Sequence, residues 1–258
     1  LEPLVKADDA PAAEALLMER APLLTPEARA EAGQRVAWIY YVRGQDVEAR
    51  RVADTWRSGA TGDWSQQSAW VSGLASWRLN DCNAACQAFR EVGTRASEPS
   101  FAAAGYYWAA RSEMACRRPA AVESLLKAAA RSSETFYGLI ARRTLNMDTR
   151  LAPLNTAPNP RVDALPNVQR ALELARIGER DLAGEHLRHQ ARLGSPADHA
   201  GLVAVAKRLD LAATQHFLAH FGQPGSQVPA AARYPRPNWT PRDGWRIDPA
   251  LGFAHALQ

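Results

Sequence analysis

The feature that most constrains the fold is a helix–turn–helix unit that recurs along the chain. Small and apolar residues recur three and four positions apart with few β-branched runs, which is typical of amphipathic helices. Turn residues interrupt this pattern at Gly44, Asn80–Asp81, Gly178–Glu179 and near Asp210, at spacings of 36, 98 and 32 residues. Such periods are typical of stacked helical hairpins. The long interval predicts about three units, with less regular helix pairs over residues 99–145.

Two of these units show the pattern in detail. In residues 27–56 a first helix is predicted to end at about Val42 and a second to end at about Trp56, with Gly44 just past the first helix and Asp46 as the cap of the second. The unit over residues 65–93 approximates the tetratricopeptide pattern, with large residues on its first helix and small ones on its second. The residues that match are Trp70, Leu74, Trp77, Ala84, Ala88 and Phe89. The sequence therefore predicts an all-α superhelical solenoid of tetratricopeptide-like helical hairpins, each covering the apolar face of its neighbour.

Two proline-rich stretches interrupt the helices and divide the chain. Residues 146–166 contain four prolines in 21 positions and cannot form one continuous helix. Residues 222–247 are rich in proline and glycine, and Asp248 and Pro249 then suit the N-cap and first position of a new helix. We expect a helical-repeat superhelix over 1–145, a hinge over 146–166, a second helical domain over 167–221, a linker over 222–247 and a further helix over 248–258.

The composition excludes several classes of protein. No apolar run reaches the roughly 20 residues that span a bilayer, so no membrane span is expected. The net charge of +4 and pI of about 9.2 favour anionic partners, but arginine is spread along every helix without a Lys/Arg block, which disfavours nucleic-acid binding. The first residues, LEPLVKADDAP, contain no signal peptide, which indicates a processed or trimmed start.

Cysteine and histidine spacings predict no cofactor and no metal site. Cys82, Cys86 and Cys116 match no zinc pattern and are expected to be structural thiols. In an oxidising compartment, Cys82 or Cys86 could form a disulfide with Cys116. The histidine pairs 186/189 and 216/220 have helical spacing but no acidic or cysteine partner in register, so surface positions are expected. The sequence has no phosphate loop, nucleophile elbow or zinc-protease helix.

Six of the eight tryptophans fall into two groups by position. One group lies on first helices of the units and is expected to pack between hairpins: Trp38, Trp70, Trp77 and Trp108. Trp239 and Trp245 lie in the proline-rich linker. They could fix that linker onto the solenoid or face a ligand, and we favour the first.

Two segments together resemble a known family. SSETFYGLIARRTL (132–145) resembles the Ser-x-Phe-Tyr-Gly-Leu-x-Ala segment near the end of the superhelical region in soluble lytic transglycosylases of bacterial cell walls. Gly138 inside this expected helix indicates close backbone packing. Residues 232–258 resemble the start of that family's lysozyme-like catalytic domain, where a Tyr-Pro linker precedes Asp-Pro-x-Leu and an apolar helix. Phe253 and His255 depart from the aliphatic residues usual there.

The resemblance implies a function for the whole protein. It implies a periplasmic enzyme that cleaves the β-1,4 bond between N-acetylmuramic acid and N-acetylglucosamine with a 1,6-anhydro product. The catalytic Glu of the family would follow Gln258, so we expect no catalytic residue among these 258 and no activity from them alone. The expected partners are peptidoglycan glycan strands, the catalytic domain and further cell-wall proteins. The residues expected to contact substrate or another domain are Phe136, Tyr137, Tyr234, Trp239 and Trp245.

Two other interpretations come from different classes. A tetratricopeptide-like scaffold would bind a protein partner in its concave face and perform no sugar chemistry. A regulatory region would cap or recruit a separate cell-wall enzyme. The Tyr-Pro linker followed by Asp-Pro-x-Leu favours the transglycosylase interpretation, because an interaction solenoid has no need of it.

Overall fold

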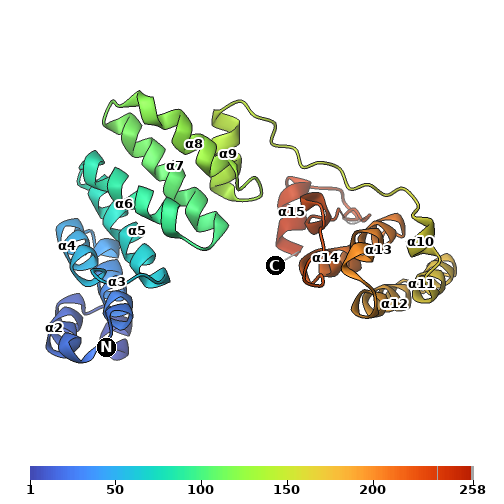
Figure 1. Cartoon of the computed structure of the whole chain (residues 1–258), viewed down its shortest axis with the longest axis horizontal. Helices are drawn as coiled ribbons and strands as arrows, with labels where there is room; N and C mark the ends of the chain where they lie inside the picture. The colour runs from blue at the N-terminus through green and yellow to red at the C-terminus, as the bar shows by residue number, and fades with distance from the viewer. Residues whose placement is uncertain (237, 257–258) are drawn as a thin grey trace. The chain divides into compact units, whose positions relative to one another are not determined.

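The computed structural model of the chain describes residues 1–236 and 238–256, and these residues form helices and loops without a strand (Figure 1). The predicted all-α, solenoid-like fold is confirmed. The chain divides into two compact units, Leu1–Thr149 and Arg150–Gln258. Leu257 and Gln258, at the end of the helix expected over 248–258, lie outside the described residues. No helix within the described ranges has the length and apolar character needed to cross a membrane.

Unit 1 is a row of antiparallel helical hairpins in which each helix packs on the next along the chain. Its α-helices, joined in places by single 3₁₀ turns, are α1 (Glu2–Lys6), α2 (Ala10–Arg20), α3 (Pro26–Val42), α4 (Asp46–Trp56), α5 (Asp63–Arg78), α6 (Cys82–Arg95), α7 (Pro99–Ala115), α8 (Val122–Ala130) and α9 (Phe136–Thr144). The predicted helix ends at Val42 and Trp56 are confirmed.

A left-handed residue marks the turn of every repeat. Positive φ angles fall just after a helix end at Asp8, Gly44, Asn80, Arg117, Asn146, Gly178 and Asp210, which are 36, 36, 37, 29, 32 and 32 residues apart. All of them except Asn146 lie in the turn of a helical hairpin. At each turn the next amide reaches back to a carbonyl five residues earlier, as in Gln45 N to Tyr40 O at 2.9 Å. This is the Schellman end of a helix. The turn at Arg117 lies within the 98-residue interval, where further units were predicted, whereas Asn146 follows α9 at the start of the predicted 146–166 hinge.

The helix caps were predicted with mixed success. Asp46 is not a cap: Gln45 holds that position without a side-chain hydrogen bond, and Asp46 is the first helical residue. Its carboxylate instead pairs with Arg78 Nε at 3.1 Å. Asp81 and Asp248 do cap their helices, because Asp81 Oδ1 accepts from Ala84 N at 3.0 Å and Asp248 Oδ1 accepts from Ala250 N at 2.8 Å.

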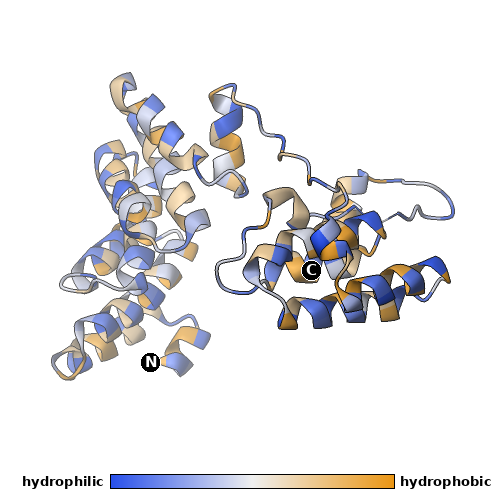
Figure 2. Ribbon diagram, turned by 45° about the vertical axis from the view of Figure 1, so that its right-hand side comes forward, coloured by the Kyte–Doolittle hydropathy of each residue, from blue (hydrophilic) through white to orange (hydrophobic). Residues whose placement is uncertain are grey.

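Alanine fills much of the core. Ala, Val and Leu side chains form two adjoining clusters in unit 1, one over α1–α5 and one over α5–α9, and alternate with polar residues along the helices (Figure 2). Small side chains let neighbouring helices approach closely, so the large residues are few and fit against them. Phe89, fully buried on α6, is the largest side chain of the second cluster.

Unit 2 repeats the hairpin arrangement with a shorter row. It contains α10 (Pro160–Asp163), α11 (Pro166–Arg176), α12 (Arg180–Leu193), α13 (Pro196–Arg208), α14 (Ala212–His220) and α15 (Pro249–Ala256). The stretch predicted as a hinge, 146–166, is non-helical only to Asn159, because α10 follows and places the fully buried Val162 in the unit 2 core.

The first part of the predicted 222–247 linker is attached to unit 2. Ala230–Arg233 form a 3₁₀ turn, and the fully buried Ala232 belongs to the unit 2 core. Gln215 Nε2 donates to Ala232 O at 2.9 Å, and Gln223 Nε2 donates to Ala191 O at 2.8 Å. These bonds hold the segment against α14 and α12.

One disulfide closes the middle of unit 1. Cys82, the first residue of α6, is bonded to Cys116, the C-cap of α7, with their Cα atoms 5.6 Å apart. Cys86 is a free, buried thiol. Of the two pairings the sequence left open, the structure therefore has Cys82–Cys116.

Candidate functional site

Phe136 and Tyr137 lie at one end of a series of aromatic rings across unit 1. Tyr137 on α9 contacts Tyr107 on α7 at 5.3 Å between ring centroids, and Tyr107 contacts Trp108 at 6.5 Å. Trp108 reaches Trp77 on α5 at 5.4 Å. Phe136 is 69% exposed at the end of this series. The Phe136 ring is thus accessible to a ligand, whereas Tyr137 is half-buried and Trp77 and Trp108 are partly buried against the core.

Three of the four tryptophans on first helices follow the prediction. Trp70 packs on Phe89 at 5.2 Å, and Trp77 and Trp108 pack between α5 and α7, as expected. Trp38 is 43% exposed, and the ring it contacts, Tyr41 at 5.4 Å, is on the same helix. This ring contact therefore lies within one helix, and the predicted packing of Trp38 between hairpins stays a prediction.

Gly138 explains why the Phe-Tyr-Gly segment needs its glycine. A Cβ at this position would lie 1.9 Å from the carbonyl oxygen of Ser132, a backbone atom that no rotamer change can move. Thr135, the N-cap of α9, accepts from Gly138 N at 3.1 Å. The close packing predicted at this residue is confirmed, and it fixes the sharp turn from α8 into α9.

Trp239 and Trp245 pack together at the start of α15. Their ring centroids are 5.3 Å apart, and both rings contact Phe253 of α15, at 5.7 and 5.1 Å. The Trp245 ring also covers Gly252, where a Cβ would lie 2.6 Å from it. The two tryptophans therefore fix the linker, and what they fix it to is α15. Tyr234, earlier in the linker, is 49% exposed and is not in this ring cluster.

The buried carboxylates of unit 1 have structural partners. Glu113 Oε1 accepts from Cys86 Sγ at 3.2 Å and from Arg90 Nη2 at 2.9 Å, and its Oε2 accepts from Arg118 Nε at 2.7 Å. Burial raises the pKa of Glu113, but these hydrogen bonds outweigh it and hold the pKa below 4.5. Burial also raises the pKa of the Cys86 thiol. An ionised carboxylate and a neutral thiol at pH 7 suit neither acid catalysis nor nucleophilic attack.

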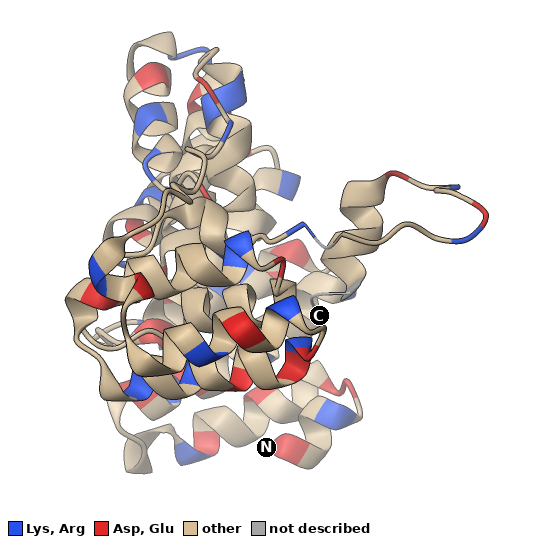
Figure 3. Cartoon of the chain, turned by 90° about the vertical axis from the view of Figure 1, so that its right-hand side faces the viewer, with Lys and Arg blue, Asp and Glu red and all other residues tan. Residues whose placement is uncertain are grey.

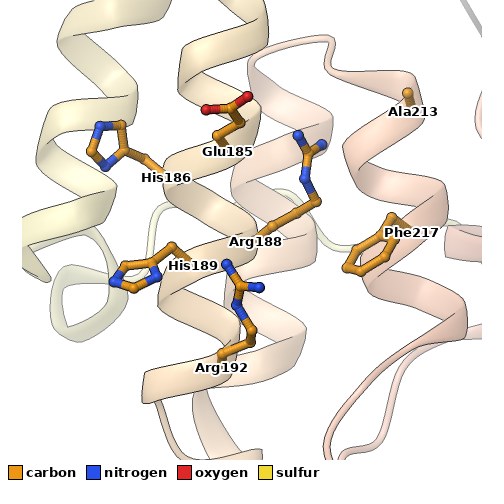
Figure 4. A pocket seen from close by; sticks show the side chains of 7 residues that line it. All are labelled: Glu185, His186, Arg188, His189, Arg192, Ala213 and Phe217. Carbon is orange, nitrogen blue, oxygen red and sulfur yellow. The ribbon is translucent and has the colours of Figure 1, made fainter.

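A pocket of about 620 Å³ opens between α12 and α14 of unit 2 (Figure 4). Its volume is within the roughly 300–1,000 Å³ that is usual for small-molecule sites. Arg188, Arg192 and Phe217 line it together with His186, His189 and Glu185. The pocket therefore combines two guanidinium groups with one carboxylate and one aromatic ring.

Arg188 is held in this pocket by two neighbours, Thr214 and Phe217. Its Nη1 donates to the buried Thr214 Oγ1 at 3.0 Å, and its guanidinium carbon lies 6.0 Å from the centre of the Phe217 ring. Gly184 lets α14 approach, because a Cβ there would lie 2.4 Å from Thr214 Oγ1. The guanidinium has five N–H donors, and the bond to Thr214 occupies one of them.

His186 contributes a different group to the same pocket. Asn167 Nδ2 donates to Gln190 Oε1 at 3.0 Å, so Asn167 Oδ1 faces His186 Nδ1 at 3.3 Å as the acceptor. A neutral His186 ring therefore has its proton on Nδ1 and presents Nε2 as an acceptor. His216 Nδ1 and His220 Nδ1 instead lie against the carbonyls of Arg233 and His216 at 3.2 and 3.0 Å.

The sequence did not predict this pocket. The 186/189 spacing was noted as a helical pair, but Arg188 and Arg192 lie one turn apart on that same helix and were not singled out. Phe217 comes from α14, so its meeting with Arg188 depends on the fold. Among the described residues, no group of three or more His, Cys, Asp and Glu side chains is arranged to hold a metal ion.

Neither protein-family models nor curated proteins match this sequence.

Proposed function

We propose that this chain is the noncatalytic superhelical region of a periplasmic soluble lytic transglycosylase. Its full-length form would cleave the N-acetylmuramic acid–N-acetylglucosamine β-1,4 bond of peptidoglycan with formation of a 1,6-anhydro end. The helical solenoid would position glycan strands and support the catalytic domain. The proposal starts from the resemblance of residues 132–145 and 232–258 to that family.

The observation that most supports the proposal is the organisation of residues 239–256. Asp248 caps α15 with Pro249 as its first residue, and Trp239 and Trp245 enclose Phe253 on that helix. A repeat scaffold needs no aromatic cluster around a helix that lies beyond its last hairpin. A helix that begins a further domain does need such a fixed start.

The disulfide is compatible with a periplasmic location, and the charge distribution is compatible with a partner other than nucleic acid. Disulfides persist in oxidising compartments such as the bacterial periplasm, and Cys82–Cys116 joins two helices of the solenoid. Basic and acidic side chains are interspersed over the helices, and many form ion pairs (Figure 3). The basic residues of the described helices form no Lys/Arg block, which disfavours nucleic-acid binding.

Sedimentation with purified peptidoglycan sacculi tests the proposal. We expect the 258-residue chain to sediment with sacculi and to release no anhydro-muropeptides. A chain extended by the residues that its gene encodes after 258 should release them, and that extension should begin with Glu-Ser. Anhydro-muropeptides from the 258-residue chain, or an extension without this Glu, would contradict the proposal.

The alternative is a tetratricopeptide-like scaffold for protein partners. The confirmed solenoid fold and the exposed Phe136 ring favour it, since such repeats bind partners through exposed residues of their helices. This alternative predicts no sedimentation with sacculi at any salt concentration. The same experiment therefore separates the two functions.

A further inference from the structure

The pocket between α12 and α14 has cationic groups without an anionic partner. No ion pair to Arg188 or Arg192 is formed within the described part of the chain, although many other arginines there, such as Arg51, Arg57 and Arg208, form one. Glu185 is the one carboxylate that lines the pocket, on the same helix. The excess of positive charge favours an anionic ligand.

The remaining groups restrict the kind of anion. Thr214 and Phe217 fix Arg188, so its guanidinium is already ordered before a ligand binds. Arg192 lies one turn along α12, within reach of a second ligand oxygen. The planar fork of arginine matches a carboxylate in a bidentate arrangement. The Phe217 ring, 41% exposed, adds an apolar surface that a bare inorganic anion would leave unused.

His186 adds a hydrogen-bond acceptor to these donors. Its Nε2 can accept from an amide N–H of the ligand, since Asn167 fixes the proton on Nδ1. Carboxylates, amide groups and short aliphatic side chains occur together in a short acidic peptide. The pocket volume of about 620 Å³ suits a peptide of a few residues rather than a protein surface.

We propose that this pocket binds a short peptide with free carboxylates, namely the stem peptide of peptidoglycan. The choice of stem peptide rests on the proposed function; the chemistry of the pocket alone gives the acidic peptide. Arg188 and Arg192 bind the carboxylates, His186 Nε2 accepts from a backbone amide, and Phe217 covers aliphatic carbons. Unit 2 would then recognise the peptide branches of the wall while the glycan strand is bound elsewhere.

Calorimetric titration of the 258-residue chain tests this inference. The probe is the stem tetrapeptide released from sacculi by an amidase, and the control is the same peptide with its carboxylates converted to amides. We expect saturable binding of the free acid and at least tenfold weaker binding of the amide, since charged hydrogen bonds are lost. Equal binding of both peptides, or no binding of either, would overturn the proposal.

Variants place the binding in this pocket. Arg188→Gln and Arg192→Gln should each weaken binding about tenfold or more, by loss of a charge-assisted contact. Arg131→Gln removes an exposed arginine at the end of α8 and is the matched control, which should bind like the wild type. Unchanged affinity in both pocket variants, with circular dichroism showing intact helices, would refute the assignment.

Further arms identify the ligand and separate this inference from the proposed function. Inorganic phosphate or an all-L acidic peptide of equal charge that binds as tightly would overturn the stem-peptide assignment. If the chain sediments with sacculi but does not bind the stem peptide, the proposed function is supported and the peptide-binding role of this pocket is refuted. If the chain binds the stem peptide but does not sediment with sacculi, the peptide-binding role of the pocket is supported and the proposed function is contradicted.

Discussion

At the scale of single residues, buried charge in unit 1 depends on complete pairing. Glu14 is 6% exposed, and Arg51 donates to both of its oxygens, at 2.6 and 2.9 Å. Tyr40 donates its hydroxyl to Oε2 at 2.9 Å. The hydrogen bond from Arg51 is the main reason that the pKa of Glu14 lies below 4.5, while burial and the bond to Glu14 raise the pKa of Tyr40 to about 12.

This pairing predicts a specific dependence of stability on pH. Because the folded-state pKa of Glu14 is lowered, the unfolded chain binds a proton first as pH falls below about 4.5. The stabilisation is fully present above that pH and is lost as pH falls through the folded pKa. We expect Glu14→Gln to lower the free energy of unfolding by about 1–3 kcal/mol at pH 7 and by less at pH 3, measured by urea titration.

Glu19→Gln on the same helix is the control for this prediction. Glu19 is exposed and pairs with the adjacent Arg20. Its substitution should change the free energy of unfolding by less than about 0.5 kcal/mol at either pH. An equal loss of stability for Glu14→Gln at pH 3 and pH 7 would show that ionisation of this group is not the cause.

Residue roles were predictable where the cause is local. Asp248 caps its helix through its own side chain and a nearby amide, and the sequence predicted this cap; Asp81, predicted only as a turn residue, caps α6 in the same way. Asp46 looked equally suitable and is not a cap, because Arg78 from the next hairpin binds its carboxylate. That competition involves a contact 32 residues away in the chain, which sequence patterns do not report.

At the scale of elements, the Cys82–Cys116 bond ties α6 to α7 across a separation of 34 residues. Closing a loop of this length restricts the unfolded chain and stabilises the folded state by about 3–4 kcal/mol. We therefore expect dithiothreitol to lower the urea concentration at the midpoint of unfolding of unit 1. Unfolding is measured by circular dichroism. Cys82→Ser should lower the midpoint to a similar extent and abolish the response to reductant.

Cys86 provides the matched control for the disulfide. Its buried thiol is one helical turn from Cys82 but takes no part in the bond. Cys86→Ala should keep the full response to dithiothreitol, whatever its own stability. A response lost in Cys86→Ala and kept in Cys82→Ser would mean that the other pairing is present in solution.

The long helices could be predicted and the short ones could not. Helices α3 and α4 have the periodicity and turn residues that define their C-terminal ends, and Val42 and Trp56 were predicted correctly as the last residues. Helix α10 has only four residues, and its formation depends on tertiary contact. The buried Val162 fits against Gly201, where a Cβ would lie 2.6 Å from it, and Arg208 Nη2 binds Asp163 Oδ1 at 2.6 Å.

At the scale of the whole molecule, the chain contains two units with separate cores. The clusters of unit 1 and the cluster of unit 2 share no residue, and the backbone from 150 to 159 forms no helix. Each unit therefore buries its own apolar surface, which is the main driving force for folding. The proline content of this stretch predicted that the helices are interrupted here. The two separate cores explain why the residues on either side of it fold as separate units.

Limited digestion with proteinase K tests this organisation. We expect the first cut within residues 150–159, giving two fragments that resist further cleavage and keep helical circular dichroism, because a protease needs an extended segment. Two unfolding transitions should appear in calorimetry. A first cut inside a hairpin such as α5–α6, or one cooperative transition for the whole chain, would contradict it.

The sequence by itself determined the helical class, the approximate hairpin period, the turns at Gly44, Asn80, Gly178 and Asp210, and the interruption by proline. These depend on local sterics and on a 3.6-residue periodicity, so neighbouring residues suffice to specify them. Only the tertiary structure decided that Cys82 rather than Cys86 pairs with Cys116, that Trp239 and Trp245 enclose Phe253, and that Arg188 meets Phe217 in a pocket. Those contacts join residues from different elements, and their distances depend on how the helices pack.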